Sequence, residues 1–223
     1  MAITVLLADD HSLVRKGLKH VLEEAADIRV VGDASNGLQA IYEYRRTRPS
    51  VVILDISMPG MDGLETVKHL LSSDPKARIL ILTMYPEEQF ALRVLQAGAL
   101  GYITKGTSPQ ELHEAVRSVA RGKRFLSQQA ENALNLGLLA ERSRLGPVAS
   151  LSDRELQVLC FIAQGLRLSR IAAELGLSVK TIETYRHRVL DKLYLQTDAD
   201  ICRFAYDNKL VEGRAVRTAD SQG

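Results

Sequence analysis

The sequence predicts an α/β domain with a doubly wound, five-stranded parallel sheet, followed by a small all-α domain. Five short runs rich in Val, Ile and Leu lie in the first half, at residues 3–8, 28–33, 51–54, 79–83 and 100–104. Segments with helical spacing alternate with these runs, and this order predicts a parallel sheet with helices on both faces. The second half has no such runs, and its apolar residues follow helical spacing.

Length and composition agree with a globular protein. The chain has 223 residues, of which 46% are hydrophobic and 25% charged, and its net charge is +2. These values exclude a disordered or low-complexity chain. No apolar run approaches the roughly 20 residues of a membrane span, and the first residues do not resemble a signal peptide, so we expect a soluble, cytoplasmic protein. Cys160 and Cys202 lack metal-binding spacing, and we interpret them as buried free thiols.

Capping signals divide the chain. Ser108, Pro109 and Glu111 predict a capping box that opens a helix ending near Gly122. We therefore expect a first domain over residues 1–122, a linker over 123–147 with a short helix near 128–141, and a disordered tail over 212–223. Between them, residues 148–211 predict four helices, over 153–163, 168–175, 179–193 and 198–208, the first of them opened by a second capping box at Ser152–Glu155.

Polar side chains follow the ends of the predicted strands, where chemistry occurs in open parallel sheets. Asp9 and Asp10 follow the first strand, Asp55 the third, Thr83 ends the fourth, and Lys105 follows the fifth. Carboxylates this close repel one another unless a cation neutralises them, and Mg²⁺ prefers oxygen ligands. An aspartate here can also attack phosphorus and form an aspartyl-phosphate. The alternative is a set of ordinary polar strand ends that face water.

Four motifs in combination resemble a two-component receiver domain, which has a flavodoxin-like fold: LADDH (7–11), ILDISMPGMDG (53–63), LT (82–83) and GYITK (101–105). The resemblance implies that Asp55 accepts phosphate from a sensor histidine kinase. It also implies Mg²⁺ ligands at Asp9, Asp10, Asp55 and the backbone carbonyl of Ser57, and contacts from Thr83 and Lys105 to the phosphoryl group.

The same resemblance pairs Thr83 with Tyr102 as a switch that reorients on phosphorylation; the alternative for Tyr102 is a simple packed aromatic. One departure is glycine after Lys105, where many receivers have proline with a cis bond, so the geometry of this peptide bond is open.

The helical half predicts a helix, a tight turn at Gly176 and a second helix capped by Ser178. Apolar residues at nine positions, Val179 among them, are expected to share one core, with a polar, basic face opposite that suits the DNA major groove. Lys180, Thr181, Glu183, Thr184, Tyr185, Arg186, His187 and Arg188 are the candidate DNA-binding residues. Lys180, Tyr185, Arg186 and Arg188 are expected at phosphates, and Glu183, Thr184 and His187 at base edges. The alternative is a solvated helix face.

Residues 151–159, 163–165, 171–175, 178–186 and 192–193 resemble a LuxR-type helix-turn-helix. Together with the receiver motifs, they make the chain similar to response regulators of the NarL/FixJ family. This resemblance implies a regulator that is not an enzyme: phosphorylation of Asp55 shifts the receiver and favours a homodimer that binds double-stranded promoter DNA, with the last helix at the dimer contact. A sensor histidine kinase is the expected partner, RNA polymerase is a candidate further partner, and no membrane partner is expected.

Two other hypotheses remain at the level of sequence. The receiver could act as a dimerisation module without phosphorylation, in which case Asp55→Asn would leave DNA binding unchanged. Alternatively, the helical domain could be an adaptor for a protein partner, and alanine at Lys180 and Arg188 would then leave function intact.

Overall fold

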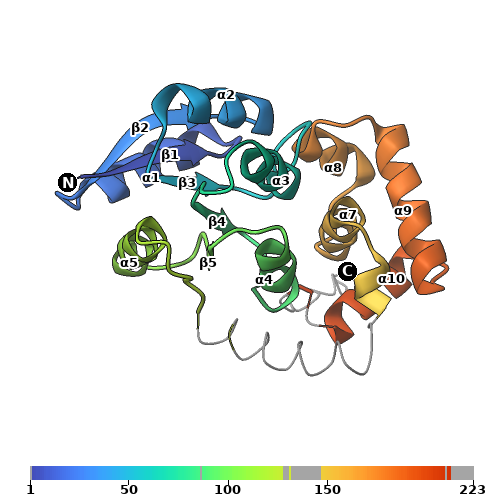
Figure 1. Cartoon of the computed structure of the whole chain (residues 1–223). Coiled ribbons are helices and arrows are strands. Elements are labelled where there is room, and N and C mark those ends of the chain that lie inside the picture. The colour runs from blue at the N-terminus through green and yellow to red at the C-terminus, as the bar shows by residue number, and fades with distance from the viewer. Residues whose placement is uncertain (1, 86, 128–130, 132–146, 209, 212–223) are drawn as a thin grey trace, which may run out of the picture.

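A computed structural model of the chain describes residues 2–85, 87–127, 131, 147–208 and 210–211. Within these residues the first half forms an α/β domain and the second half a helical domain, as predicted (Figure 1). None of the described helices is long and apolar enough to cross a membrane. The predicted linker helix near 128–141, apart from residue 131, and the predicted tail lie outside the described residues.

The sheet confirms the predicted parallel topology. Its strands are β1 (Ile3–Ala8), β2 (Ile28–Ala34), β3 (Val51–Leu54), β4 (Ile79–Thr83) and β5 (Gly101–Thr104). They pair in the order β2-β1-β3-β4-β5, and every pair is parallel. The chain changes winding direction between β1 and β3, and ligands of such sheets bind outside the strand ends at this point.

Helices cover both faces of the sheet. Helices α1 (Ser12–Glu23) and α5 (Pro109–Ala120) pack with Leu7, Ile53 and Leu80. On the other face, α2 (Gly37–Thr47), α3 (Gly63–Ser73) and α4 (Glu87–Gln96) pack with alternate strand residues, such as Leu54 and Ile81. Because both faces are buried, the strands are apolar throughout.

The second domain contains a short 3₁₀ turn, η1 (Pro147–Ser150), and helices α7 (Asp153–Ala163), α8 (Leu168–Leu175), α9 (Val179–Leu193) and α10 (Asp198–Asp207). The capping box between Ser152 and Glu155 forms as predicted. Gly176 ends α8 with a φ of 62°, a left-handed conformation that glycine adopts without strain, and the Ser178 hydroxyl caps α9.

Three sequence predictions were wrong in detail. Glu111 does not complete a capping box with Ser108, because its carboxylate accepts a hydrogen bond from the Thr107 hydroxyl at 2.7 Å instead. Val179 is 43% exposed, since it begins α9 at the edge of the domain. Cys160 is buried, but Cys202 is only partly so; neither forms a disulfide.

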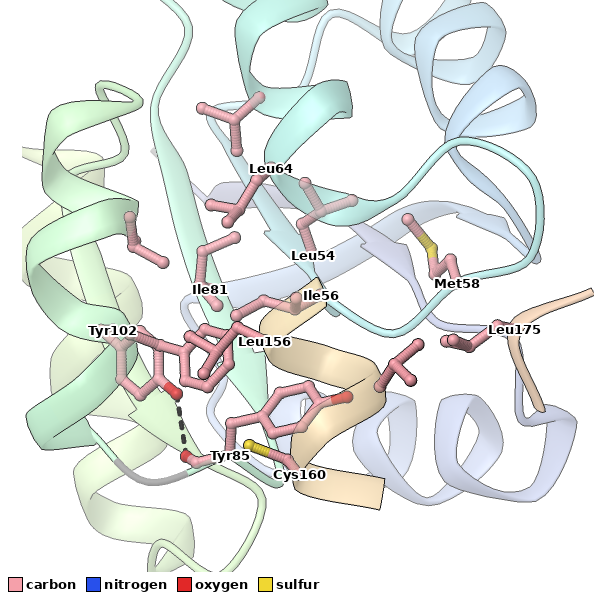
Figure 2. Close-up of a cluster of buried hydrophobic side chains, with 14 of the residues drawn as sticks. Leu54, Ile56, Met58, Leu64, Ile81, Tyr85, Tyr102, Leu156, Cys160 and Leu175 are labelled. Atoms are coloured by element: carbon pink, nitrogen blue, oxygen red, sulfur yellow. Dashed lines mark hydrogen bonds between the residues drawn. The ribbon is translucent and has the colours of Figure 1, made fainter. Parts of the chain in front are cut away.

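The two domains pack against each other through a continuous apolar cluster. Figure 2 shows Leu156 and Cys160 of α7 and Leu175 of α8 among side chains that follow or belong to the central strands, such as Ile56 and Ile81. The helical domain therefore lies on the side of the sheet covered by α3 and α4 (Figure 1).

Candidate functional site

The carboxyl ends of the strands bring the predicted acidic and basic residues together. Asp9 follows β1, Asp55 follows β3 and Lys105 follows β5, and all three are largely buried. The Lys105 Nζ atom lies 2.6 Å from an Oδ2 atom of each aspartate. The Lys105–Gly106 peptide bond is trans. This ammonium thus bridges two carboxylates at the sheet's switch point.

Burial sets the electrostatics of this site. It raises the pKa of Asp55, and the Lys105 ammonium opposes that rise without cancelling it. Burial lowers the pKa of Lys105, but the carboxylates of Asp55 and Asp9 raise it further, so that it lies above its ordinary value. Partial burial also raises the pKa of Asp10, against the opposing effect of His11. The charged carboxylates are therefore costly in this site, and a bound cation would stabilise them.

The donor set fits a hard divalent cation. Ligand atoms of Asp9, Asp10 and His11 lie within 4.8 Å of one another. The Oδ1 atom of Asp55 is buried and accepts no hydrogen bond from the described residues. Three carboxylates with oxygen atoms to offer are the ligands that Mg²⁺ prefers. His11 begins α1 as its N-cap residue, and its Nδ1 atom lies 2.7 Å from a carboxylate oxygen of Asp10.

A layer of hydroxyl groups lies beside the acidic site. The Ser57 hydroxyl is 3.0 Å from the Tyr85 hydroxyl, and the Tyr102 hydroxyl donates to the Tyr85 carbonyl at 2.8 Å (Figure 2). Thr83 and Tyr102 are both buried, and they belong to the neighbouring strands β4 and β5. This arrangement joins the two proposed switch residues to one segment, the chain that leaves β4 at Tyr85.

Sequence reasoning missed a second wall of the site. A cavity of about 130 Å³ lies over Asp55, Thr83 and Lys105, and helical-domain residues Phe161, Gln164 and Glu174 line it as well. The Nε2 atom of His11 lies 3.8 Å from Glu174. No local pattern marks these residues in the sequence, because the contacts join segments of different domains that lie far apart in the chain.

The candidate DNA-binding residues occupy the outer face of α9. Lys180, Glu183, Thr184, His187 and Arg188 are exposed. Three others, Thr181, Tyr185 and Arg186, are partly buried. Arg186 is held within its own domain, since its Nε atom lies 2.5 Å from a carboxylate oxygen of Asp198.

At the start of this face, a surface hollow of about 380 Å³ is lined by Ser178, Lys180, Thr181, Thr184, Tyr185 and Arg188. Hydroxyls, cations and helix N-terminal amides together suit a phosphate group.

Comparisons with known proteins agree with both halves of this description. The model of the response regulator receiver domain matches residues 5–117, and that of bacterial regulatory proteins of the luxR family matches residues 149–205. The response regulator UvrY of Escherichia coli K12 is 39% identical over 96% of this chain and 98% of its own length. GacA of Pseudomonas aeruginosa is 37% identical over 94% of this chain and 98% of its own length.

A solved structure is also similar over most of the chain. RcsB of Salmonella enterica serovar Typhimurium, bound to a promoter in the presence of phosphomimetic BeF₃⁻, superposes with a TM-score of 0.63 at 26% identity. The match covers 93% of this chain and all of that one.

Proposed function

Because the chain belongs to the response regulators, which join a receiver domain to a luxR-family DNA-binding domain, we propose that phosphorylation of Asp55 controls promoter binding by α9. The receiver would span residues 1–122 and the DNA-binding domain residues 148–211. The observation that carries the proposal is the position of Asp55, which lies beside an ammonium group and lines a cavity. Its buried Oδ1 atom accepts no hydrogen bond within the part of the chain that the structure describes.

The residues around Asp55 suit phosphoryl transfer. Asp55 would attack phosphorus as a carboxylate, and the Lys105 ammonium would hold one phosphoryl oxygen while it releases part of its ion pair. Thr83 ends β4 beside this site, and its buried hydroxyl, which helps to lower the pKa of Asp55, would donate to a second phosphoryl oxygen. Tyr102 would then follow the displacement of Thr83, as part of the segment that includes Tyr85.

Asp9, Asp10, Asp55 and the Ser57 carbonyl would hold Mg²⁺. When bound, this ion supplies positive charge that offsets repulsion between the carboxylates and an incoming phosphoryl group. A sensor histidine kinase would be the donor, which agrees with the receiver match.

The outer face of α9 would enter the major groove. Lys180, Tyr185 and Arg188 surround the hollow at the start of the helix and are proposed to contact phosphates, whereas Glu183, Thr184 and His187 project where base edges would lie. Arg186 keeps its ion pair with Asp198 and would contact phosphate only from the edge of this face. Thr181 belongs to the first turn of the helix.

Promoter DNA is the ligand in the RcsB complex. By analogy we propose double-stranded promoter DNA, a homodimer and a cytoplasmic location for this chain, with RNA polymerase as a candidate further partner.

The test is selection of genomic DNA fragments by the purified full-length chain, with Mg²⁺ and acetyl phosphate, alongside Asp55→Asn and Arg188→Ala. We expect phosphorylated wild type to enrich paired half-sites, Asp55→Asn to lose this enrichment, and Arg188→Ala to bind all fragments more weakly.

Enrichment of the same sites by wild type and Asp55→Asn would contradict control by Asp55 and support a receiver that only dimerises. Enrichment of no fragment would contradict DNA binding and direct the search to protein partners.

A further inference from the structure

The helical domain covers the proposed phosphoacceptor. The cavity over Asp55 is lined by Phe161 near the end of α7, Gln164 just after it, and Glu174 of α8. Asp55 itself is only 3% exposed. The ring of Tyr85 packs edge-on against the ring of Phe161, with centroids 6.1 Å apart. A phosphodonor must therefore reach Asp55 past, or after the departure of, the DNA-binding domain.

One arginine of the helical domain fastens this cover to the acceptor loop, residues 57–62. The guanidinium of Arg154 donates to the carbonyls of Gly60 at 2.8 Å and Met58 at 3.3 Å, and its Nε atom lies 3.4 Å from the Asp62 carboxylate. Both side chains of this ion pair are about nine-tenths buried. Arg154 thus holds the segment that follows Asp55 and carries Ser57.

A second clamp involves Asp153, the residue before Arg154, and its arginine comes from the receiver. Arg93 of α4 lies 2.9 Å from the Asp153 carboxylate and donates to the Val148 carbonyl at 2.8 Å. Its side chain is 17% exposed. The two clamps meet at the start of α7, where Asp153 and Arg154 are neighbours, but they use different arginines, one from each domain.

The DNA-reading face takes no part in this contact. Helices α7 and α8 lie between the receiver and α9, which occupies the outer side of the molecule (Figure 1). Lys180, Glu183, Thr184, His187 and Arg188 are exposed in the docked arrangement. Docking therefore hides the phosphoacceptor and leaves the reading helix uncovered.

We infer that the docked helical domain gates the phosphorylation of Asp55, so that release of the Arg154 and Arg93 clamps sets the rate of phosphoryl transfer. This inference rests on the proposed function. In the transfer, a carboxylate oxygen of Asp55 forms a bond to phosphorus, the bond from phosphorus to the bridging oxygen of acetyl phosphate breaks, and acetate leaves with that electron pair. The new group adds negative charge next to Glu174, which opposes redocking.

The test measures the rate at which acetyl phosphate, with Mg²⁺, phosphorylates the full-length chain. Phosphate-affinity gels separate the phosphorylated chain by its mobility and give this rate. The variants are Arg154→Ala and Arg93→Gln, one in each domain, so that a folding defect in one leaves the other informative. Arg167→Ala, an exposed arginine at the start of α8, is the matched control. Affinity for a non-specific DNA duplex is measured in parallel on the unphosphorylated proteins.

We expect each clamp variant to be phosphorylated about tenfold faster than wild type, within the roughly 5- to 150-fold range typical of coupling between sites. The control should match wild type, and affinity for the duplex should be the same in all four proteins. Equal rates of phosphorylation in all proteins would overturn the gate but leave the proposed function intact. Tighter duplex binding by the clamp variants at an unchanged rate would show that docking hides the DNA site instead. Absence of phosphorylation in every protein would overturn both proposals.

Discussion

At the scale of single residues, Lys105 holds the acidic site together. Its ammonium lies 2.6 Å from a carboxylate oxygen of both Asp9 and Asp55, and all three side chains are largely buried. An ion pair of this kind adds little net stability, but loss of one partner leaves the other charges buried and uncompensated. The same residue therefore serves folding as well as the proposed chemistry.

Lys105→Met should destabilise the chain by about 3 kcal/mol in urea unfolding, because two buried carboxylates lose their cation. Added Mg²⁺ should raise the midpoint more for this variant than for wild type, since the ion would replace the missing charge. Lys19→Met, at an exposed position of α1, is the control. If added Mg²⁺ leaves the urea unfolding midpoint of Lys105→Met unchanged, this result would contradict a cation site at these carboxylates.

At the scale of elements, the start of α7 depends on an ionised carboxylate. The buried Glu155 accepts hydrogen bonds from the Ser152 backbone at 2.7 Å and from Lys192 of α9 at 2.6 Å. Burial raises the pKa of Glu155, but Lys192 and Ser152 together lower it more, so that it lies below its ordinary value. One side chain thus caps α7 and ties it to α9.

The sign of the pH dependence follows from that depressed pKa. The stabilisation is complete above the ordinary glutamate pKa of about 4.3 and is lost as the pH falls through the lower value of the folded chain. Glu155→Gln should therefore unfold more easily than wild type at neutral pH, by about 1 to 2 kcal/mol, from the loss of charge-assisted hydrogen bonds. The difference in unfolding midpoint should shrink as the pH falls below the ordinary glutamate pKa of about 4.3. Glu114→Gln, at an exposed position of α5, should show no such convergence.

The turns that follow α7 and α8 offer a matched pair of glycines, Gly165 and Gly176. Gly176 and Gly165 both have positive φ, 62° and 81°, but an added Cβ at Gly176 would lie 2.5 Å from Pro59 of the receiver, and one at Gly165 would meet nothing within 4 Å. Both alanine variants should lose about 1 kcal/mol of stability from the left-handed conformation. Only Gly176→Ala should also accelerate hydrogen exchange in the acceptor loop, because it alone pushes the domains apart. Equal exchange in the two variants would contradict a tight contact at Pro59.

Elements could be predicted from the sequence wherever local physics decides them. The strand runs, the cap at Ser152 and the glycine end at Gly176 all follow from neighbours within a few residues, and the structure confirms them. The convergence of Asp9, Asp55 and Lys105 was also predictable, because parallel strands end at one edge. The missing capping box at Glu111 was not predictable, since the Thr107 hydroxyl donates to its carboxylate instead.

The covering wall at Phe161 and Glu174 was beyond sequence reasoning as well, because it depends on how two domains pack.

At the scale of the whole molecule, the two halves share one apolar cluster, and Tyr85 lies where they meet. The carbonyl of Tyr85 accepts a hydrogen bond from Tyr102, and its hydroxyl is hydrogen-bonded to Ser57. Its ring packs against the ring of Phe161. We therefore expect a rearrangement at Thr83, two residues earlier, to affect the domain contact through the segment around Tyr85. The molecule is therefore expected to have a docked state and a released one.

Beryllofluoride with Mg²⁺ should expand the molecule, because the phosphate mimic adds negative charge at the wall formed by Glu174. Small-angle X-ray scattering at a concentration that keeps the chain monomeric should show a larger radius of gyration than without the mimic. Asp55→Asn, treated in the same way, should keep the smaller radius. An unchanged radius in wild type would mean that the domains stay docked when the site is charged.

The contacts of Arg154 with the acceptor loop have a consequence for the recombination of receiver and helical domains between related proteins. Two of its three partners are the backbone carbonyls of Met58 and Gly60, which are present whatever side chains stand there. A helical domain recombined onto a foreign receiver would keep these two bonds if the loop followed the same path. The pairs with Asp62 and between Arg93 and Asp153 would need matching residues on both sides. In hybrid regulators the helical domain should thus still dock on the receiver. The hybrids should differ chiefly in the stability of that docked state.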